Sequence, residues 1–596
     1  MTRMRPQPPW MRRSLALPLA AGVVLTAPPA VSAAAGPGRP TARLSFEIST
    51  TADAHDAHPG DGRCADRSGQ CTLRAAVEEA AAQPPDTAVS ITLPAGTFPL
   101  TLGSLDLDGG PVSVSGAGAR SAVIEATGRF RVLDVGSAAT VTLSGVTITG
   151  GRAGSGGYGG GVLNTGRLWI TDSIVTANRA TAGGGIANAG GTVTLSHSSV
   201  TGNHAPFYGG GGIQNGGIRN VAGTVEVIAS TVAGNASGGD GGGILNGQNG
   251  HPGQAGRPAA PVRSACPEVP RCARSARPGT PAPAAPGPPA PPGLRLIVTG
   301  SRIDGNTGTN SGAGIANDGG TAVVTGSTLS GNTAGQSPGG AVANYGPLIL
   351  VRDTLSRNRA GYGGALEAAY AGTPGRQVVT GSTLTGNTAL AGGAIDDGTD
   401  TLYVTASTLA GNSATLGGGI EVEGASFVYL RSSTLASNSA ASGTGGAIDT
   451  YGCGGGVVSY TMIAGNSSGL NLPCSNLVVT GSIIAASAPG PNCAGAAPHE
   501  SAGYNLDTGV SCAFAKPTDL TAADPRLGPL AANGGPTLTR APAGGSPAID
   551  HGGTRATGCP AADQRGVSRP QGPACDIGAV EVQVTSRPQP TARPPR

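Results

Sequence analysis

Residues 407–412 read STLAGN, and a similar segment that ends in asparagine returns along most of the chain. Most intervals between these asparagines are 25 to 29 residues long. The recurring asparagines are Asn178, Asn203, Asn235, Asn306, Asn332, Asn358, Asn387, Asn412, Asn438 and Asn466. A fixed period of this length is typical of solenoid proteins, in which each repeat stacks on its neighbours.

Glycine clusters with one aliphatic residue follow the asparagines, as in GGGI at 183–186 and GGAI at 392–395. Between the clusters lie short alternating runs such as VTLS at 193–196, which are typical of strands. Each repeat is too short and too poor in apolar residues to bury its own face, so it must stack. We predict an all-β fold, a right-handed parallel β-helix with three strands per turn and glycines at its corners. About a dozen turns would make a rod of roughly 60 Å.

The recurring asparagines are predicted to form a ladder. In such a coil they can lie inward at a bend, where each side-chain amide bonds to the next one at the strand spacing. A ladder satisfies buried amides that would otherwise be costly. Glycosylation or turn preference alone does not explain ten recurrences in register, and the consensus leucines of a leucine-rich repeat are missing.

The composition excludes several classes of protein. The 596 residues include 103 Gly and 48 Pro, and only 3% are aromatic and 12% charged, which argues against a conventional globular domain. The chain has no Gly-X-Y period, so it is not a collagen. Its glycines recur at a fixed interval, which argues against disorder. The net charge is +3, and only Lys516 among 37 basic residues is a lysine, so nucleic acid is a poor partner.

The N-terminal segment has the features of a secretory signal. Several arginines precede an apolar stretch at 15–27, and small residues follow, so residues 1–34 are predicted to be a signal peptide. A membrane anchor would need about 20 apolar residues, and this stretch is shorter and broken by prolines. We therefore expect a secreted, extracellular monomer with no membrane span after signal removal. Its attachment to the surface of the producing cell is left open.

Export makes the ten cysteines expected disulfide formers. Neighbour pairing is the simplest interpretation, and a zinc site is disfavoured because no C-x2-C or H-x3-H spacing occurs. The expected pairs are Cys64 with Cys71, Cys266 with Cys272, Cys453 with Cys474, Cys493 with Cys512, and Cys559 with Cys575.

The chain divides into three regions between the signal peptide and a polar, disordered tail at 583–596. We predict an N-terminal cap at 35–90, the β-helix at 91–485 and a disulfide-bearing C-terminal region at 486–582. An amphipathic pattern at 72–82 predicts a helix that caps the open first turn, whose strand edges would otherwise aggregate. A Pro-rich insert at 247–293 is predicted to be a disordered loop outside the coils.

Two terminal regions resemble known modules. The stretch from Phe46 to Asp53, followed by CTLRAA at 71–76, resembles the N-terminal CSLREA module of exported bacterial proteins. The segments DPRLGPL at 524–530, GSPAID at 545–550, DQRG at 563–566 and DIGAVE at 576–581 resemble the end of the choice-of-anchor Q family, without its usual C-terminal anchor.

The resemblance implies export and a right-handed parallel β-helix related in architecture to the pectate lyases, and it supplies no catalytic residues. The middle repeats also resemble those of chlamydial polymorphic outer-membrane adhesins, without the autotransporter barrel.

Acidic residues recur at one position of four successive repeats. They follow the aliphatic residue of the glycine cluster and are Glu367, Asp396, Glu421 and Asp449. Because the preceding aliphatic residue points inward, alternation predicts that these carboxylates face outward as a stripe. Nearby in the sequence are Asp397, Glu423, Tyr403, Tyr429 and Arg431, of which the two tyrosines share another register.

This stripe allows three interpretations, of which the plainest is a solvated acidic surface. Hard oxygen ligands suit Ca²⁺, so calcium is a possible cofactor, and carboxylates beside aromatic faces suit glycan binding. Carboxylates on adjacent or alternate turns would also approach the separations used in glycoside hydrolysis.

The leading hypothesis for function is a secreted β-helical protein that binds extracellular polysaccharide or a cell surface in an adhesin-like role. The alternative is a polysaccharide lyase or glycoside hydrolase acting at the stripe. Arg431 is the only obvious basic candidate for proton abstraction there. A purely structural extracellular protein is the third hypothesis.

Overall fold

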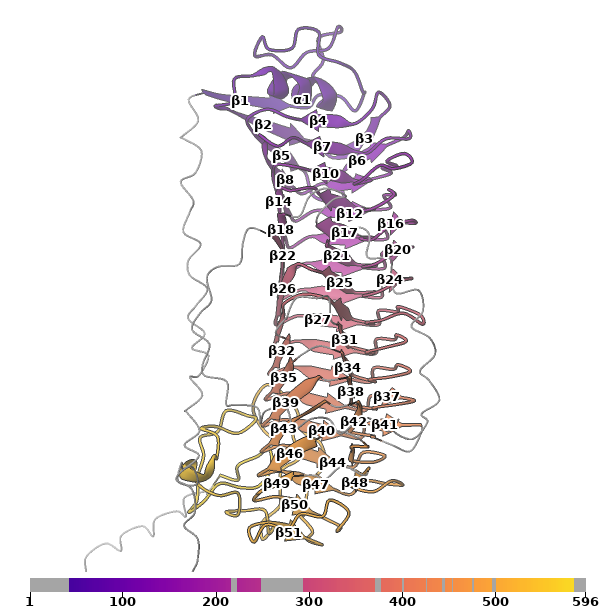
Figure 1. Ribbon diagram of the computed structural model, residues 1–596. Coiled ribbons are helices and arrows are strands. Elements are labelled where there is room, and N and C mark those ends of the chain that lie inside the picture. The colour runs from indigo at the N-terminus through magenta and orange to yellow at the C-terminus, as the bar shows by residue number, and fades with distance from the viewer. Residues whose placement is uncertain are drawn as a thin grey trace, which may run out of the picture.

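The protein forms a parallel β-solenoid of about 13 turns, described here from a computed structural model (Figure 1). The structure describes residues 42–215, 222–247, 293–369, 377–398, 401–424, 426–441, 445–452, 454–473, 476–495 and 500–583. The predicted signal peptide, most of the Pro-rich insert, the tail, and the pairs Cys266–Cys272 and Cys453–Cys474 therefore lie outside the described residues.

Three long parallel sheets run the length of the solenoid. Sheet A has 16 strands, from β1 (Ala42–Glu47) to β49 (Glu500–Gly503). Sheet B also has 16, from β3 (Gly96–Leu100) to β51 (Leu520–Thr521). Sheet C has 14, from β4 (Leu105–Leu107) to β48 (Cys493–Ala494).

One turn illustrates the path of the chain. It begins with β34 (Ile395–Gly398) in sheet C, continues through β35 (Thr401–Thr405) in sheet A and β36 (Thr408–Ala410) in sheet B, and reaches the next turn at β38 (Ile420–Glu423). In β35, buried residues alternate with half-buried ones, because successive side chains point to opposite faces of a strand. The inward side chains of all three sheets form one continuous apolar core that extends from Phe46 to Phe514.

The ten asparagines form one buried column at the end of sheet B. Each Nδ2 from Asn178 to Asn438 donates to the Oδ1 of the asparagine one turn on, at 2.9–3.1 Å. Asn412 shows the full pattern, since its Oδ1 accepts from both the backbone N–H and the Nδ2 of Asn387. Its Nδ2 also donates to Leu384 O at 3.0 Å, so every polar atom of the amide is bonded.

Two further polar columns were not predicted. A second asparagine ladder lies in sheet C, where side-chain amides bond at 2.6–2.9 Å through Asn164, Asn188, Asn215, Asn246, Asn317 and Asn344. A serine column lies at the corner between sheets A and B, where the backbone N–H of one serine donates to the Oγ of the next, as from Ser382 to Ser407 at 3.1 Å. The residue before each of these corner positions adopts positive φ, including Ala406 at 50°.

The helix α1 (Leu73–Ala82) lies at the N-terminal end of the stack (Figure 1). Thr72 Oγ1 caps it by accepting from Ala75 N at 3.0 Å, and its apolar face belongs to the main core. Arg74 is buried and pairs with Asp53, with 2.7 Å between Nε and Oδ1. The Arg74–Asp53 ion pair therefore joins the CTLRAA segment to the loop that precedes it.

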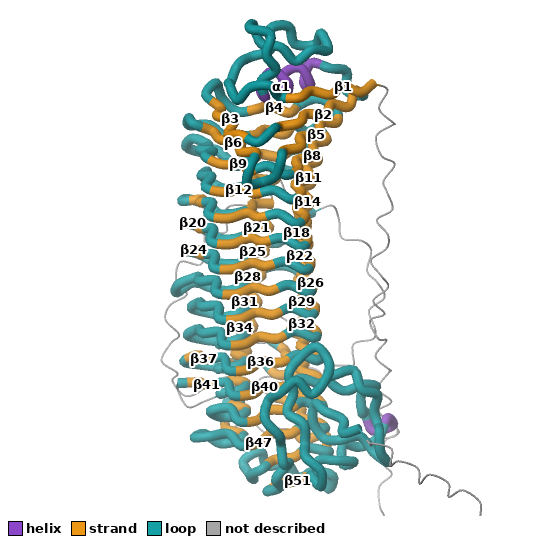
Figure 2. Tube along the Cα trace, turned by 180° about the vertical axis from the view of Figure 1, so that it is seen from behind, coloured by secondary structure: helices purple, strands orange, loops and turns teal. Residues whose placement is uncertain are grey.

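The C-terminal region turns back along the solenoid and covers part of sheet B (Figure 2). Ile577, Ala579 and Ala548 pack against Met462 and Ile483 in a second apolar cluster. Gln564 bridges the two parts, since its Oε1 accepts from Thr434 Oγ1 at 2.6 Å and its Nε2 donates to Thr408 Oγ1 at 2.9 Å.

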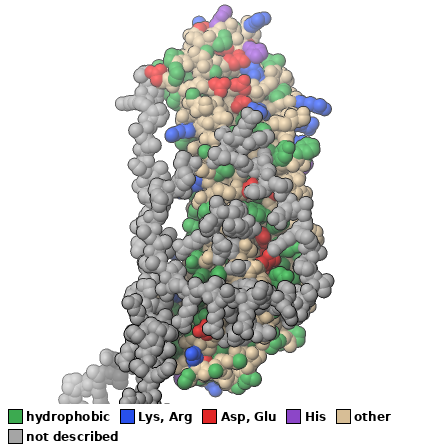
Figure 3. Space-filling view, viewed as in Figure 1, with side chains coloured by type: hydrophobic (Ala, Val, Ile, Leu, Met, Phe, Trp, Pro, Cys, Tyr) green, Lys and Arg blue, Asp and Glu red, His purple; other side chains and the backbone are tan. Residues whose placement is uncertain are grey.

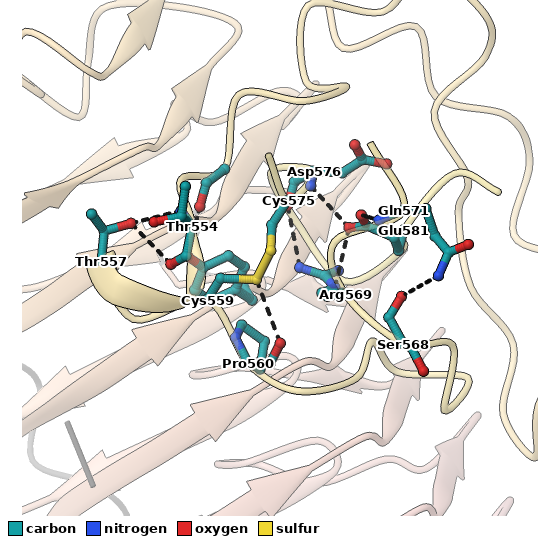
Figure 4. Close-up of a disulfide and its surroundings, with 12 residues drawn as sticks. Thr554, Thr557, Cys559, Pro560, Ser568, Arg569, Gln571, Cys575, Asp576 and Glu581 are labelled. Carbon is teal, nitrogen blue, oxygen red and sulfur yellow. Dashed lines mark hydrogen bonds and ion pairs between the residues drawn. A yellow bond between two sulfur atoms is a disulfide. The ribbon is translucent and has the colours of Figure 1, made fainter. Parts of the chain in front are cut away.

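Three of the expected disulfides lie among the described residues, and all three are confirmed: Cys64–Cys71, Cys493–Cys512 and Cys559–Cys575. The last of these lies beside Arg569, whose Nε is 3.5 Å from Glu581 Oε2 (Figure 4). Arg569 also lies over the ring of Tyr460, 5.3 Å from its centroid. Burial lowers the pKa of Arg569, and the nearby carboxylates of Glu581, Asp563 and Asp576 oppose that shift.

The described part of the chain contains no helix that is long and apolar enough to span a membrane.

Candidate functional site

The four acidic residues are stacked on neighbouring strands of sheet C. Glu367 in β31 (Leu366–Ala369) pairs with Asp396, Asp396 with Glu421, and Glu421 with Asp449 in β42 (Ile448–Tyr451). Asn471 continues this acidic column, and its Nδ2 donates to Asp449 Oδ1 at 2.8 Å. The positions predicted to share one register therefore do so.

The acidic column does not form the outward, solvent-facing stripe that alternation predicts. Its four side chains are buried, with exposed fractions of 5% for Glu367, 1% for Asp396, 2% for Glu421 and 0% for Asp449. The same position is also buried in earlier turns, where it holds Ala187, Gln214 or Ala343.

Local chain geometry explains the burial. A glycine four residues before each carboxylate adopts positive φ and turns the preceding loop back over the outer face of sheet C. At Gly417, with φ +56°, an added Cβ would come within 2.7 Å of Glu421 Oε2. At Gly445 an added Cβ would come within 2.3 Å of Asp449 Cβ. The loop between sheets B and C thus covers the column, and alternation alone could not predict this.

The remaining acidic candidates are not assembled into a metal site. Asp397 is fully buried, whereas Glu423 is half-buried at the end of β38. Among the residues that the structure describes, no group of three or more His, Cys, Asp or Glu could hold a metal ion. Nothing in the described geometry therefore supports the calcium interpretation.

Tyr403 and Tyr429 lie on sheet A, so they belong to a different face from the acidic column. They are partners on β35 and β39 (Phe427–Arg431), with ring centroids 5.0 Å apart and an interplanar angle of 12°. Burial raises the pKa of Tyr429, and the neighbouring Tyr403 adds to that shift. Arg431 is half-buried at the end of β39, and burial lowers its pKa.

The stacked tyrosines belong to a longer row of outward-facing apolar side chains, which we call the apolar row. Ladder pairing places one member on each of eight consecutive strands of sheet A. The members are Ile297, Val323, Ile349, Val378, Tyr403, Tyr429, Val457 and Val478. Ile349 is 40% exposed and the other members are half-buried.

A basic groove lies in the N-terminal half of the solenoid and was missed from the sequence. It is a hollow of about 320 Å³ lined by Arg129, Arg152 and Arg179, with Phe207 at its side. The sequence signal was present, because Arg179 and His204 each directly follow a ladder asparagine. On the face shown in Figure 3, the visible charged side chains gather mainly toward the N-terminal end.

No protein-family model matches the chain, and no curated protein is significantly similar to it. Among solved structures, the crystal structure of pectate lyase Pel9A aligns with 90% of this chain and 96% of its own, at 13% identity and a TM-score of 0.24. A protein described as Geobacillus virus E2 ORF18 aligns with 62% of this chain, at 9% identity and a TM-score of 0.23. This chain covers about half the length of the viral protein, 51%. The β-solenoid assignment therefore rests on the strand order itself, and membership of the choice-of-anchor Q family stays a prediction.

Proposed function

We propose that the protein is an extracellular β-helical rod that binds polysaccharide, with the apolar row of sheet A as the contact surface. The observation that carries this proposal is the stacked Tyr403–Tyr429 pair within a straight row of aliphatic side chains. Aromatic rings present a large apolar area with a polar hydroxyl at the edge, which suits the mixed character of a sugar ring. A flat row along the rod axis suits an extended polymer.

The disulfides support an extracellular location. Three disulfides are formed among the described residues, and such bonds persist in oxidising compartments. The position of α1 at the first turn supports its role as a cap, because its apolar face joins the core there. Secretion through residues 1–34 and a monomeric state remain parts of this proposal.

Binding is favoured over cleavage because the carboxylates offered as catalytic groups are covered. Glu367, Asp396, Glu421 and Asp449 are each no more than 5% exposed, so a polymer on the surface does not reach them. Arg431, the basic candidate, lies on sheet A rather than beside the column on sheet C. The acidic column therefore offers the lyase or hydrolase alternative no carboxylate that a surface-bound polymer can reach.

The test is retention of the purified protein on cellulose, chitin, pectin and alginate, with and without calcium, together with an assay for newly cut chain ends. We expect retention on at least one polymer without new ends. The Y403A/Y429A double variant should weaken that retention about tenfold or more, because aromatic contact area is lost. Tyr451→Ala, which removes a 44% exposed tyrosine on sheet C, is the matched control and should bind normally.

Three results would contradict the proposal. They are retention of the wild-type protein on none of the four polymers, binding by the double variant as strong as that of Tyr451→Ala, and accumulation of new chain ends. The first two results would reject the apolar row as a binding surface. The third would show that the protein cleaves the polymer, in favour of the enzyme alternative.

A further inference from the structure

The basic groove is built by the loops that follow strands of sheet B on successive turns. Arg129 follows β6 (Ala122–Ala126), Arg152 follows β9 (Thr147–Thr149) and Arg179 follows β12 (Ile174–Thr176). Backbone hydrogen bonds fix these loops, since Arg152 N donates to Phe130 O and Arg179 N donates to Gly151 O, both at 2.8 Å. Parallel bridges join Arg152 to Arg179 and Arg179 to His204. The basic residues are therefore spaced by the solenoid, about 4.8 Å per turn.

The three arginines carry uncompensated positive charge. All three are exposed, and within the part of the chain that the structure describes none forms an ion pair with a carboxylate. Arg179 Nη1 lies 2.8 Å from His204 Nδ1, so it faces an imidazole rather than an acid. Three like charges on neighbouring turns repel one another, and a bound anion would relieve that repulsion.

One wall of the groove is apolar. Phe207 is 70% exposed, an unusual position for a large aromatic side chain, and it lies beside Pro206 and Thr181 at the hollow. Guanidinium groups bind carboxylates and sulfates through two parallel hydrogen bonds, whereas an exposed ring offers a surface for the apolar face of a sugar. Together these groups match a ligand that alternates anionic groups with rings.

We propose that the basic groove binds an acidic polysaccharide, whose carboxylates or sulfates contact Arg129, Arg152 and Arg179 on successive turns while a sugar ring lies on Phe207. The step between turns is comparable to the length of one sugar unit, so the polymer would run along the rod axis. This inference deepens the proposed function by naming the charge class of the ligand, and it uses residues separate from the apolar row. A nucleic acid fits less well, because the chain has a net charge of only +3.

The test compares binding of polygalacturonate, dextran sulfate, neutral dextran and single-stranded DNA by wild type and by the R129Q/R152Q/R179Q variant. We expect wild type to bind one or both acidic polysaccharides, and the triple variant to bind them about tenfold or more weakly, because three charge-assisted contacts are lost. Wild-type binding should weaken with added salt, and this salt dependence should be smaller in the triple variant. Polygalacturonate and dextran sulfate separate a carboxylate ligand from a sulfate ligand.

Arg359→Gln is the matched control. Arg359 also follows a ladder asparagine and is exposed, but its bridge partners are Thr333 and Thr388 rather than basic residues. It should bind like wild type, and unchanged unfolding midpoints should show that all variants are folded. An equal loss in Arg359→Gln, full binding by the triple variant, binding of neutral dextran as tight as that of the acidic polymers, or tighter binding of DNA would each overturn the inference. The Y403A/Y429A variant keeps the groove, so loss in that variant but not in the triple variant would reject the groove and leave the apolar row standing.

Discussion

Asp353 lies in the serine column, at a position that the neighbouring turns fill with Ser327 and Ser382. Its Oδ1 accepts from Ser327 N and its Oδ2 from Val351 N, both at 2.8 Å, while its own N–H donates to Ser382 Oγ. Burial raises its pKa to about 7, and the two backbone hydrogen bonds only partly oppose that shift. The serine column thus contains one carboxyl group whose charged form is costly to bury.

This arrangement predicts a pH-dependent effect of Asp353→Ser. The folded-state pKa lies above the value of 3.8 for an exposed carboxyl, so the folded protein binds the proton more tightly than the unfolded chain. Wild type should therefore lose stability relative to the variant as pH rises from about 4 to about 7, by an amount on the order of a few kcal/mol. Urea unfolding at pH 4 and pH 8 measures this difference. The exposed Asp524→Ser serves as control, and an advantage of Asp353→Ser that does not grow with pH would contradict the argument.

Asn412 lies in the middle of the asparagine ladder, and Asn412→Ala should be strongly destabilising. The change leaves Asn387 Nδ2, Asn387 N and Leu384 O without their buried partner. Each unsatisfied buried group costs about 1–3 kcal/mol, so a loss of about 3 kcal/mol or more is expected in denaturant unfolding. Asn310→Ala, at an exposed position outside the ladder, should change stability by less than about 0.5 kcal/mol.

Among the elements, α1 is the only α-helix in the described part of the chain, and it lies where the solenoid would otherwise end openly. Val77 is 2% exposed and belongs to the main core. Val77→Asp places a charge in that core and should detach the helix, exposing the edges of the first turn. We expect oligomers or aggregates in size-exclusion chromatography with light scattering.

The same substitution at an exposed site controls for the added charge. Val510 is 72% exposed, so Val510→Asp should remain soluble and monomeric. If Val77→Asp elutes and unfolds like Val510→Asp, α1 does not protect the end of the solenoid.

At the scale of the whole molecule, each turn pairs with the turns directly before and after it, so complete turns should be separable units. Leu296 and Ala322 are ladder partners on successive turns of sheet A. Deletion of residues 296–321 therefore removes one full turn and brings Asn332 beneath Asn235 in the ladder. We expect this variant to fold, with the far-ultraviolet circular dichroism of a β protein and a cooperative transition.

A half-turn deletion of residues 296–308 is the matched control for that experiment. It removes β23 (Arg302–Asp304) and most of β22 (Leu294–Thr299) but leaves β25 (Ile315–Asp318), so this turn cannot close and the sheets lose their alignment at this point. This variant should be insoluble or protease-sensitive. Equal solubility and protease resistance of the two deletions would contradict a register-dependent stack.

The regular spacing of asparagines, glycines and alternating apolar residues determined the β-helical fold and the ladder, because both depend on contacts between neighbouring turns. The three confirmed disulfides were readable from the short separation of their cysteines in the sequence. The second asparagine ladder was also readable, since Asn188 and Asn344 each stand two residues after the aliphatic member of a glycine cluster. Alternation within a strand could say that Asp396 and Glu421 point away from the core, but not that a loop covers them. That covering, the return of the C-terminal region over sheet B and the gathering of three arginines in one groove were decided only by the tertiary structure, because each depends on where loops lie across the outer faces of the stack.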